Sequence, residues 1–290
     1  MRLALNIVTD ITLDYAIKVS EEAVRFGAES IWIGETRNLP HPFTYLLPIS
    51  ERVKVTLGTS IISAYLNDPA SVIEFSRKLL RNNIPAFIVG VGLGDIDYLK
   101  VKGVEPKNPL DFMRKYVSKL LECLPEKASV IVGTAGRRMA NLSCKITGAV
   151  LLNFVHPDYI KWVKRGIEVK CEINVIGPAL LKTFDSRLIR ALRIASAIVL
   201  KGMNEKFLRN FGFESLAEDI KKILSSGDYW KLRRYDNVLL DKFAIYGDIV
   251  DFETRIEELS KLTVNRLILG PPIYRDRNLI EKVFSKLRKY

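Results

Sequence analysis

Hydrophobic positions along the 290-residue chain follow two spacings that alternate from the N-terminus onward. Short runs that are almost wholly apolar, such as residues 3–8, predict buried strands. Residues 11–26 instead place apolar side chains at helical spacing, and Gly27 marks the end of that helix. The same succession continues along the chain and predicts eight strands, at residues 3–8, 30–34, 53–59, 86–91, 129–134, 149–154, 168–176 and 265–270.

Helical stretches separate the predicted strands. They include residues 109–123, 136–145 and 158–165, and Asp68 followed by Pro69 predicts another helix start. Strands that are joined through helices pair in parallel by right-handed crossovers. Eight such strands predict an α/β fold, the (β/α)8 TIM barrel, with its active site at the carboxyl ends of the strands. A doubly wound open sheet is the alternative, but no glycine fingerprint follows the first strand.

Composition narrows the class of protein. The chain is 48% hydrophobic and 27% charged, which is ordinary for a globular protein. No apolar run approaches the roughly 18 residues of a membrane helix, and Asp10 comes too early for a secretory signal. We therefore expect a cytoplasmic protein that binds no membrane. The net charge of +12 is spread over the chain without a dense basic arm, so we expect no nucleic-acid partner.

Cysteine and histidine point to no metal centre. Cys123, Cys144 and Cys171 lack the paired spacing of a zinc site or a disulfide framework, so we expect them to be small apolar filler. His41 and His156 each precede a proline in a predicted loop, so we expect no histidine-based metal site.

The predicted strands are followed by small and polar residues that a barrel would gather at one mouth. Ordinary turn chemistry accounts for each of them taken alone, so the prediction of a site depends on their joint placement. GTAGRR at residues 133–138 would bring backbone amides of a helix N-terminus close to a phosphate, with charge from Arg137 or Arg138. Asp95 would either cap the next helix or serve the site.

Six blocks carry a resemblance to a known family: AVRFGAESIWIGET, RVKVTLGTSIISAYLNDPASVIEFSRKL, VGVGLGDIDYLKVKGVEPKNPLDFMRKYVSKLL, VGTAGRRMANLSCKITGAVLLNFVHPDYI, KFAIYGD and RLILGPPI. In this order the chain resembles the bacterial luciferase-like superfamily of flavin and deazaflavin oxidoreductases. Within it, the chain resembles the branch that contains methylenetetrahydromethanopterin reductase, for which the third block is the most specific. The resemblance implies a single barrel domain over residues 1–290, with residues 185–240 as a helical insertion.

The resemblance also implies a site for the deazaflavin coenzyme F420, with FMN as the alternative. A non-prolyl cis peptide bond between Ser60 and Ile61 would support the back of the ring, while NDP at residues 67–69 would only start the next helix. Glu35 and Asp95 would be catalytic, Asn6 and Asn153 would contact the substrate, and no metal is expected. The cofactor-binding residues would be Thr36, Ser60, Ile61, Gly92, Gly94, Gly133, Thr134, Ala135, Gly136 and Arg137.

The reaction implied by the resemblance is hydride transfer to or from a one-carbon tetrahydromethanopterin-type pterin, in a homodimer or larger homo-oligomer. Asp95 would supply a proton or stabilise the acceptor. Three residues depart from the family pattern: Asn6 replaces a glutamate, Thr36 a histidine and Thr147 an aspartate. Two alternatives therefore stay open, an FMN-dependent luciferase-like monooxygenase and a non-catalytic barrel of the same family.

Overall fold

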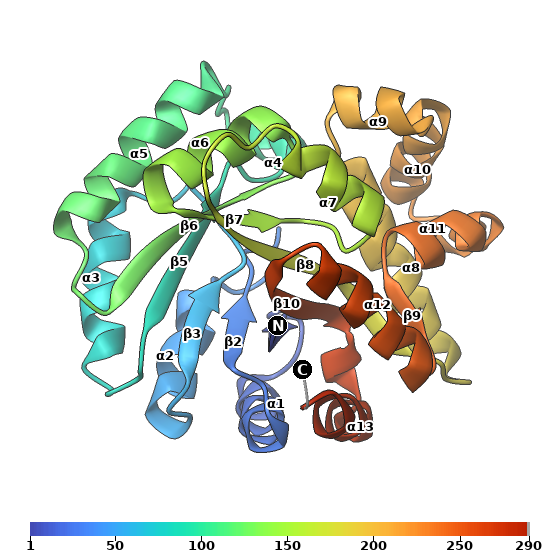
Figure 1. Ribbon diagram of the computed structural model, residues 1–290, viewed down its shortest axis with the longest axis horizontal. Coiled ribbons are helices and arrows are strands. Elements are labelled where there is room, and N and C mark those ends of the chain that lie inside the picture. Colours follow the sequence, from blue (N-terminus) through green and yellow to red (C-terminus); the bar gives the residue numbers. More distant parts are fainter. Residues whose placement is uncertain (289–290) are drawn as a thin grey trace.

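Ten parallel strands form one sheet in the computed structural model, which describes residues 1–288 (Figure 1). β10 pairs with both β1 and β8, so eight of the strands close into a barrel. The predicted TIM barrel is confirmed, and each predicted strand overlaps one barrel strand. The barrel strands are β1 (Arg2–Ile7), β2 (Ser30–Ile33), β3 (Thr56–Thr59), β5 (Phe87–Gly92), β6 (Ala128–Thr134), β7 (Ala149–Leu152), β8 (Glu172–Leu181) and β10 (Val264–Pro272).

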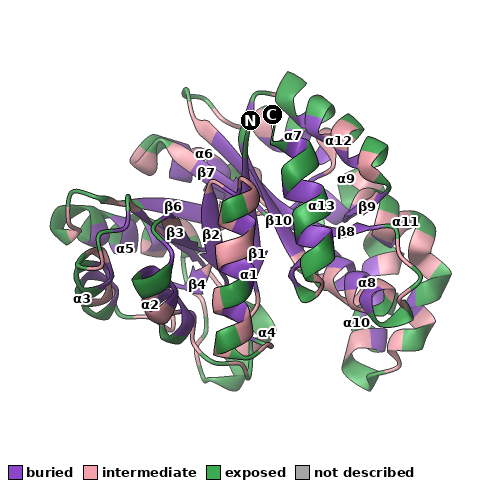
Figure 2. Ribbon diagram, turned by 90° about the horizontal axis from the view of Figure 1, so that it is seen from below, coloured by how far each residue is buried: buried purple, intermediate pink, exposed green. Residues whose placement is uncertain are grey.

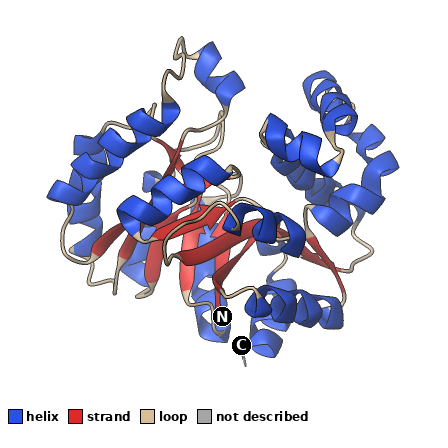
Figure 3. Ribbon diagram, turned by 45° about the horizontal axis from the view of Figure 1, so that its top comes forward, coloured by secondary structure: helices blue, strands red, loops and turns tan. Residues whose placement is uncertain are grey.

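Helices surround the barrel, and two short strands lie outside it (Figures 1 and 3). β4 (Ile62–Ser63) pairs with β5, and β9 (Ile245–Gly247) pairs with β8. The last helix, α13, packs beside α1. The surrounding helices are α1 (Leu13–Phe26), α2 (Phe43–Arg52), α3 (Pro69–Leu80), α4 (Ile96–Val101), α5 (Pro109–Cys123), α6 (Arg137–Thr147), α7 (Pro157–Lys164), α12 (Ile249–Lys261) and α13 (Arg277–Leu287).

The chain between β8 and β9 is helical and stands beside the barrel (Figure 3). It joins the barrel through aromatic rings. The centre of the Tyr159 ring, in α7, lies 4.7 Å from that of Phe207 and 4.6 Å from that of Phe211, both in α9. These rings are mostly buried, so their packing fixes this segment next to α7. The segment contains α8 (Ser186–Lys201), α9 (Glu205–Phe211), α10 (Glu214–Ser226), the 3-10 turn η1 (Tyr229–Tyr235) and α11 (Asp236–Lys242).

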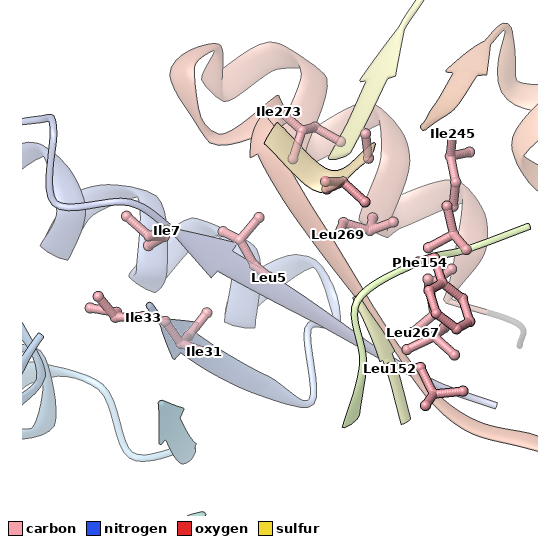
Figure 4. Packing of buried hydrophobic residues seen from close by; sticks show 14 of the residues in the cluster. Leu5, Ile7, Ile31, Ile33, Leu152, Phe154, Ile245, Leu267, Leu269 and Ile273 are labelled. Carbon is pink, nitrogen blue, oxygen red and sulfur yellow. The ribbon is translucent and has the colours of Figure 1, made fainter. Parts of the chain in front are cut away.

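The main core lies between the outer face of the barrel and the helices. On β1, Leu5 and Ile7 are fully buried and lie close to Ile31 and Ile33 of β2 (Figure 4). The helices turn buried faces to these strands and exposed faces outward (Figure 2). Because side chains alternate along a strand, the residues between these positions point into the barrel.

A second, smaller core fills the barrel itself. Its buried members are Ala4, Trp32, Ile131, Leu151, Ile176 and Ile268. Gly58 provides the room for Trp32, since a Cβ at Gly58 would lie 2.5 Å from the indole ring. Toward the amino ends of the strands the interior becomes polar, and Arg266, only 3% exposed, donates to Asn174 Oδ1 at 2.9 Å. The barrel is therefore packed below its mouth.

Two of the cysteines are bonded, which corrects the expectation that all three are apolar filler. Cys144 of α6 and Cys171, just before β8, form a disulfide with their Cα atoms 5.3 Å apart. α6 packs on β7, and β7 pairs with β8, so the fold brings together residues that lie 27 positions apart. Spacing in the sequence does not reveal this proximity. Cys123 is free and exposed.

Candidate functional site

The barrel strands end on one rim, where the inward-facing residues above the interior core meet. Side chains alternate along a strand, so residues two or four positions beyond the inward-facing side chains also point inward. Five such positions hold glycine and carry no side chain: Gly34, Gly90, Gly92, Gly133 and Gly270. Three others hold predicted site residues: Asn6, Ser60 and Asn153. The inward side of the rim therefore carries few large side chains and is partly polar.

The backbone at the end of β3 departs from the strand as predicted. The Ser60–Ile61 peptide bond is cis, which confirms that expectation. Ser60 N donates to Ile33 O at 3.0 Å, and Glu35 N donates to Ile61 O at 2.8 Å. Ser60 Oγ donates to Asn6 Oδ1 at 2.6 Å. The carboxyl ends of β1 and β2 and the residues after β3 are thus joined by hydrogen bonds at one point of the rim.

The Ile61 side chain occupies the space that glycines leave on β5 and β6. A Cβ at Gly92 would lie 2.5 Å from Ile61 Cδ1, and a Cβ at Gly133 would lie 2.6 Å from Ile61 Cγ2. The half-buried Ile61 packs against the interior core below. These two glycines, predicted to bind a cofactor, are therefore needed to seat Ile61.

Glu35 follows β2 and is half-buried. Its Oε2 accepts hydrogen bonds from the backbone N of Ser63 at 2.7 Å and from Nδ2 of Asn67 at 3.0 Å. Its Oε1 has no hydrogen-bond partner within residues 1–288. The next residue, Thr36, is exposed. Glu35 therefore uses one carboxylate oxygen to hold the following loops and keeps the other unpaired.

Asp95 lies at the start of α4 and caps that helix. Its Oδ1 accepts from the backbone N of Asp97 at 2.8 Å and of Tyr98 at 3.3 Å. Its Oδ2 lies 3.5 Å from Lys201 Nζ, and half of its side chain is exposed. Nearby Gly94 has φ +90°, and a Cβ there would lie 2.7 Å from Ser63 Oγ. The capping alternative for Asp95 is thus the one that its contacts fit.

The loop after β6 leads into α6 without a side-chain cap. Gly136 N donates to Thr134 Oγ1 at 3.0 Å, and no acidic residue stands in the first turn, where Arg137 and Arg138 lie. Two cations at the positive end of a helix dipole are unfavourable by themselves. Such a turn, with free backbone N–H groups, favours an anion.

Arg137 is held in place by α7. Its guanidinium lies 4.3 Å from the centre of the Trp162 ring, and its Nε donates to Trp162 O at 2.6 Å. Arg137 forms no ion pair within residues 1–288, so its charge stays available. Ala135, in the same loop, accepts a hydrogen bond at its carbonyl from Asn204 Nδ2 at 3.3 Å. Exposed Asn153 meets this loop only through its backbone N, which donates to Thr134 O at 3.3 Å.

Sequence reasoning missed several residues that support the rim. Asn67 holds Glu35, Lys201 pairs with Asp95, and Asn204 contacts the loop after β6. No signal in the sequence pairs Lys201 with Asp95, because 106 residues separate them. Asn67 lies in the NDP motif, but its side chain reaches back toward β2 rather than forward into α3.

Features outside the rim add little to the site. A cavity of about 500 Å³ lies beside α5 and the Ala64–Pro69 segment, and Tyr65 and Phe112 stack in its wall. It contains none of the predicted site residues.

Among residues 1–288, no three His, Cys, Asp or Glu side chains lie close enough to hold a metal ion together. Nor does any helix in that range have the length and apolar character needed to span a bilayer.

Known proteins resemble the chain in both sequence and fold, although no family model matches it. A 5,10-methylenetetrahydromethanopterin reductase of Archaeoglobus fulgidus is 21% identical over 328 residues, which covers 99% of this chain and 98% of that protein.

Two solved structures share the architecture. The coenzyme F420-dependent tetrahydromethanopterin reductase of Methanopyrus kandleri superposes with a TM-score of 0.82 at 18% identity and covers 98% of this chain and 97% of its own. The oxygenating component of 3,6-diketocamphane monooxygenase from Pseudomonas putida, in complex with FMN, has a TM-score of 0.61 at 14% identity and covers 99% of each chain. The chain is therefore similar, over almost its entire length, to methylenetetrahydromethanopterin reductases in sequence and fold, which confirms the resemblance that its motifs indicate.

Proposed function

We propose that the protein is an oxidoreductase that uses coenzyme F420 to transfer hydride to or from a one-carbon tetrahydromethanopterin-type pterin. The observation that carries this proposal is the similarity to the Archaeoglobus fulgidus reductase over 99% of the chain. The larger TM-score against the F420-dependent reductase than against the FMN-dependent monooxygenase, 0.82 against 0.61, favours F420 over FMN.

The residues at the rim fit a flat cofactor with a phosphate. The Ser60–Ile61 segment, whose Ile61 side chain is seated against Gly92 and Gly133, would support one face of the ring. The first turn of α6 would hold the phosphate through its backbone N–H groups, with Arg137 beside it. When bound, F420 supplies the carbon that gives or takes the hydride.

The two proposed catalytic carboxylates differ in how many of their oxygen atoms are already paired. Glu35 lies at the rim with an unpaired Oε1, so it could accept a hydrogen bond from a ligand or stabilise a cationic acceptor. Asp95 already caps α4 and pairs with Lys201, which leaves it fewer free positions. We therefore assign the larger role to Glu35. Asn6, which accepts from Ser60 Oγ, would act on the substrate as a neutral hydrogen-bonding group.

A cofactor titration tests the proposal. Purified protein is titrated with oxidised F420 and, separately, with FMN, and the absorbance and fluorescence of each cofactor are followed. We expect F420 to bind with micromolar affinity and FMN at least tenfold more weakly. Reduced F420 with methylenetetrahydromethanopterin should then give enzyme-dependent oxidation of the cofactor.

Other outcomes identify the alternatives. Tight FMN binding with oxygen consumption would support a monooxygenase, and a folded protein that binds neither cofactor would support a non-catalytic barrel. The resemblance also supports a homo-oligomer that is located in the cytoplasm. Light scattering on the purified protein measures its mass in solution, and a monomer would contradict the oligomer.

A further inference from the structure

Asn67 is the centre of a polar network behind the rim. Its Nδ2 donates to Glu35 Oε2 at 3.0 Å and to Ser63 O at 2.9 Å. Its Oδ1 lies 2.8 Å from Nε2 of His41. These contacts join the loop after β2 to the loop before α3, on either side of the Ser60–Ile61 segment.

The hydrogen bonds define the orientation of each group in the network. Because the Asn67 amide nitrogen donates to Glu35 and Ser63, the amide oxygen accepts, so His41 Nε2 carries a proton. His41 Nδ1 accepts from the backbone N of Phe43 at 3.3 Å and is therefore unprotonated. Neutral His41 satisfies every contact. The Asn67 side chain cannot rotate by 180° without placing its amide N–H groups against the donor of His41.

Helix capping does not explain Asn67. The cap of α3 is Asp68, whose side chain accepts from the backbone N of Ser71. The Asn67 backbone is fixed separately, since its carbonyl accepts from the hydroxyl of buried Tyr116 at 2.8 Å. Its side chain is therefore free of any role in starting the helix.

Glu35 connects the network to the rim at two places. Its backbone N donates to Ile61 O at 2.8 Å, and its carboxylate accepts from Ser63 N at 2.7 Å. We propose that Asn67 is a positioning residue, which fixes the Glu35 carboxylate and thereby the Ile61–Ser63 backbone that would support the cofactor. This inference rests on the proposed function, and it goes beyond the expectation that NDP only starts a helix.

The test substitution is Asn67→Asp. It keeps the size of the side chain and the acceptor for His41, but it removes the donor to Glu35 and to Ser63 O and sets a second carboxylate beside the first. We expect the amide of Ser63 to exchange with solvent about tenfold faster in the cofactor-free protein, because its acceptor moves. The dissociation constant for oxidised F420 should rise about tenfold.

Tyr116→Phe is the matched control. It removes the hydrogen bond to the Asn67 carbonyl and leaves the side-chain network intact. We expect Ser63 exchange and F420 affinity to stay within twofold of wild type. Equal effects of Asn67→Asp and Tyr116→Phe on both readouts would show that Asn67 only holds its loop, and would overturn the proposal.

A double-mutant cycle with Glu35→Gln decides whether Asn67 acts through Glu35. In that background the glutamine carries no charge for the aspartate introduced by Asn67→Asp to repel, and its amide oxygen can still accept from Ser63 N. We expect Asn67→Asp to cost less than threefold in Ser63 exchange and in F420 affinity there. A tenfold cost in both backgrounds would overturn the proposal. If wild type binds no F420, the proposed function fails, whereas Ser63 exchange still decides whether Asn67 positions Glu35.

Discussion

Ile61 is enclosed by glycines, which makes these positions sensitive to a single added carbon. We predict that Gly92→Ala lowers the free energy of unfolding by about 1–3 kcal/mol, because its Cβ would lie 2.5 Å from Ile61 Cδ1. Ile61→Val removes that Cδ1 and should restore most of the loss in the double variant. Urea unfolding measures both.

Gly202→Ala provides the comparison for Gly92→Ala. Gly202 has φ −77° and its nearest neighbouring atoms would lie 3.4 and 3.5 Å from a Cβ, so we expect a change within about 0.5 kcal/mol. A wild-type unfolding curve for Gly92→Ala would contradict the close packing at Ile61.

His156 predicts a pH dependence of stability. Burial, with the charges of Arg255 and Lys242, lowers the pKa of His156 to about 4 from its ordinary 6.5. Between these values the unfolded chain binds more protons than the folded one, so stability falls as the pH falls from about 6.5 to 4. The side chain is 12% exposed, and the loss attributable to it is roughly 3 kcal/mol.

His156→Asn isolates this contribution. Asparagine caps helices well and has no proton to gain, so it should keep the start of α7, where His156 Nδ1 accepts from Asp158 N. Urea unfolding at several pH values should give a shallower slope between pH 6.5 and 4 for the variant. Parallel slopes for the two proteins would contradict a depressed pKa.

At the scale of elements, the disulfide joins α6 to the start of β8. Closing a loop of 27 residues restricts the unfolded chain, which stabilises the folded state by roughly 3.5 kcal/mol by loop entropy. We predict that Cys144→Ser lowers the melting temperature by several degrees, and that reductant has the same effect on wild type but none on the variant. Cys123→Ser, at the free exposed cysteine, should melt like wild type. Equal melting of Cys144→Ser and wild type would exclude a stabilising bond.

The sequence predicts the barrel strands well because each is a short apolar run that is buried on both faces. It gives no sign of α2, since Pro40, Pro42 and Pro48 indicate a loop, yet Pro48 lies within the helix. The strands β4 and β9 are also missed. They are two and three residues long, and only their pairing with β5 and β8 makes them strands.

The part of the candidate site that could be predicted is the part set by the course of the backbone and by position on the rim. The end of β3 and the loop after β6 lie where the barrel must place them, so residues such as Ser60 and Gly133 could be named. The partners of the polar side chains could not. Asn67 meets Glu35 across 32 positions, and no local pattern encodes such a contact.

At the scale of the whole molecule, Lys201 links the helical segment after β8 to the mouth of the barrel. It ends α8, and its Nζ lies 2.7 Å from Asp97 Oδ2, in the first turn of α4, and 3.5 Å from Oδ2 of Asp95, which caps that helix. The hydrogen bond and charge of Lys201 lower the pKa of Asp97, so the pair persists at neutral pH. Arg37, after β2, lies 5.5 Å from the ring of Tyr98 in α4. α4 is thus held from two sides by polar contacts.

Lys201→Met tests whether this ion pair controls the motion of α4. Both carboxylates are more than half exposed, so we expect the free energy of unfolding to change by less than about 1 kcal/mol. Amide exchange in residues 96–101 should nevertheless rise severalfold, and high salt should raise it in wild type by screening the same pair. Lys222→Met, which removes an exposed pair with Asp219 on α10, should leave that exchange unchanged. Unaltered exchange in Lys201→Met would mean that α4 is held by its other contacts and that the ion pair does not control its motion.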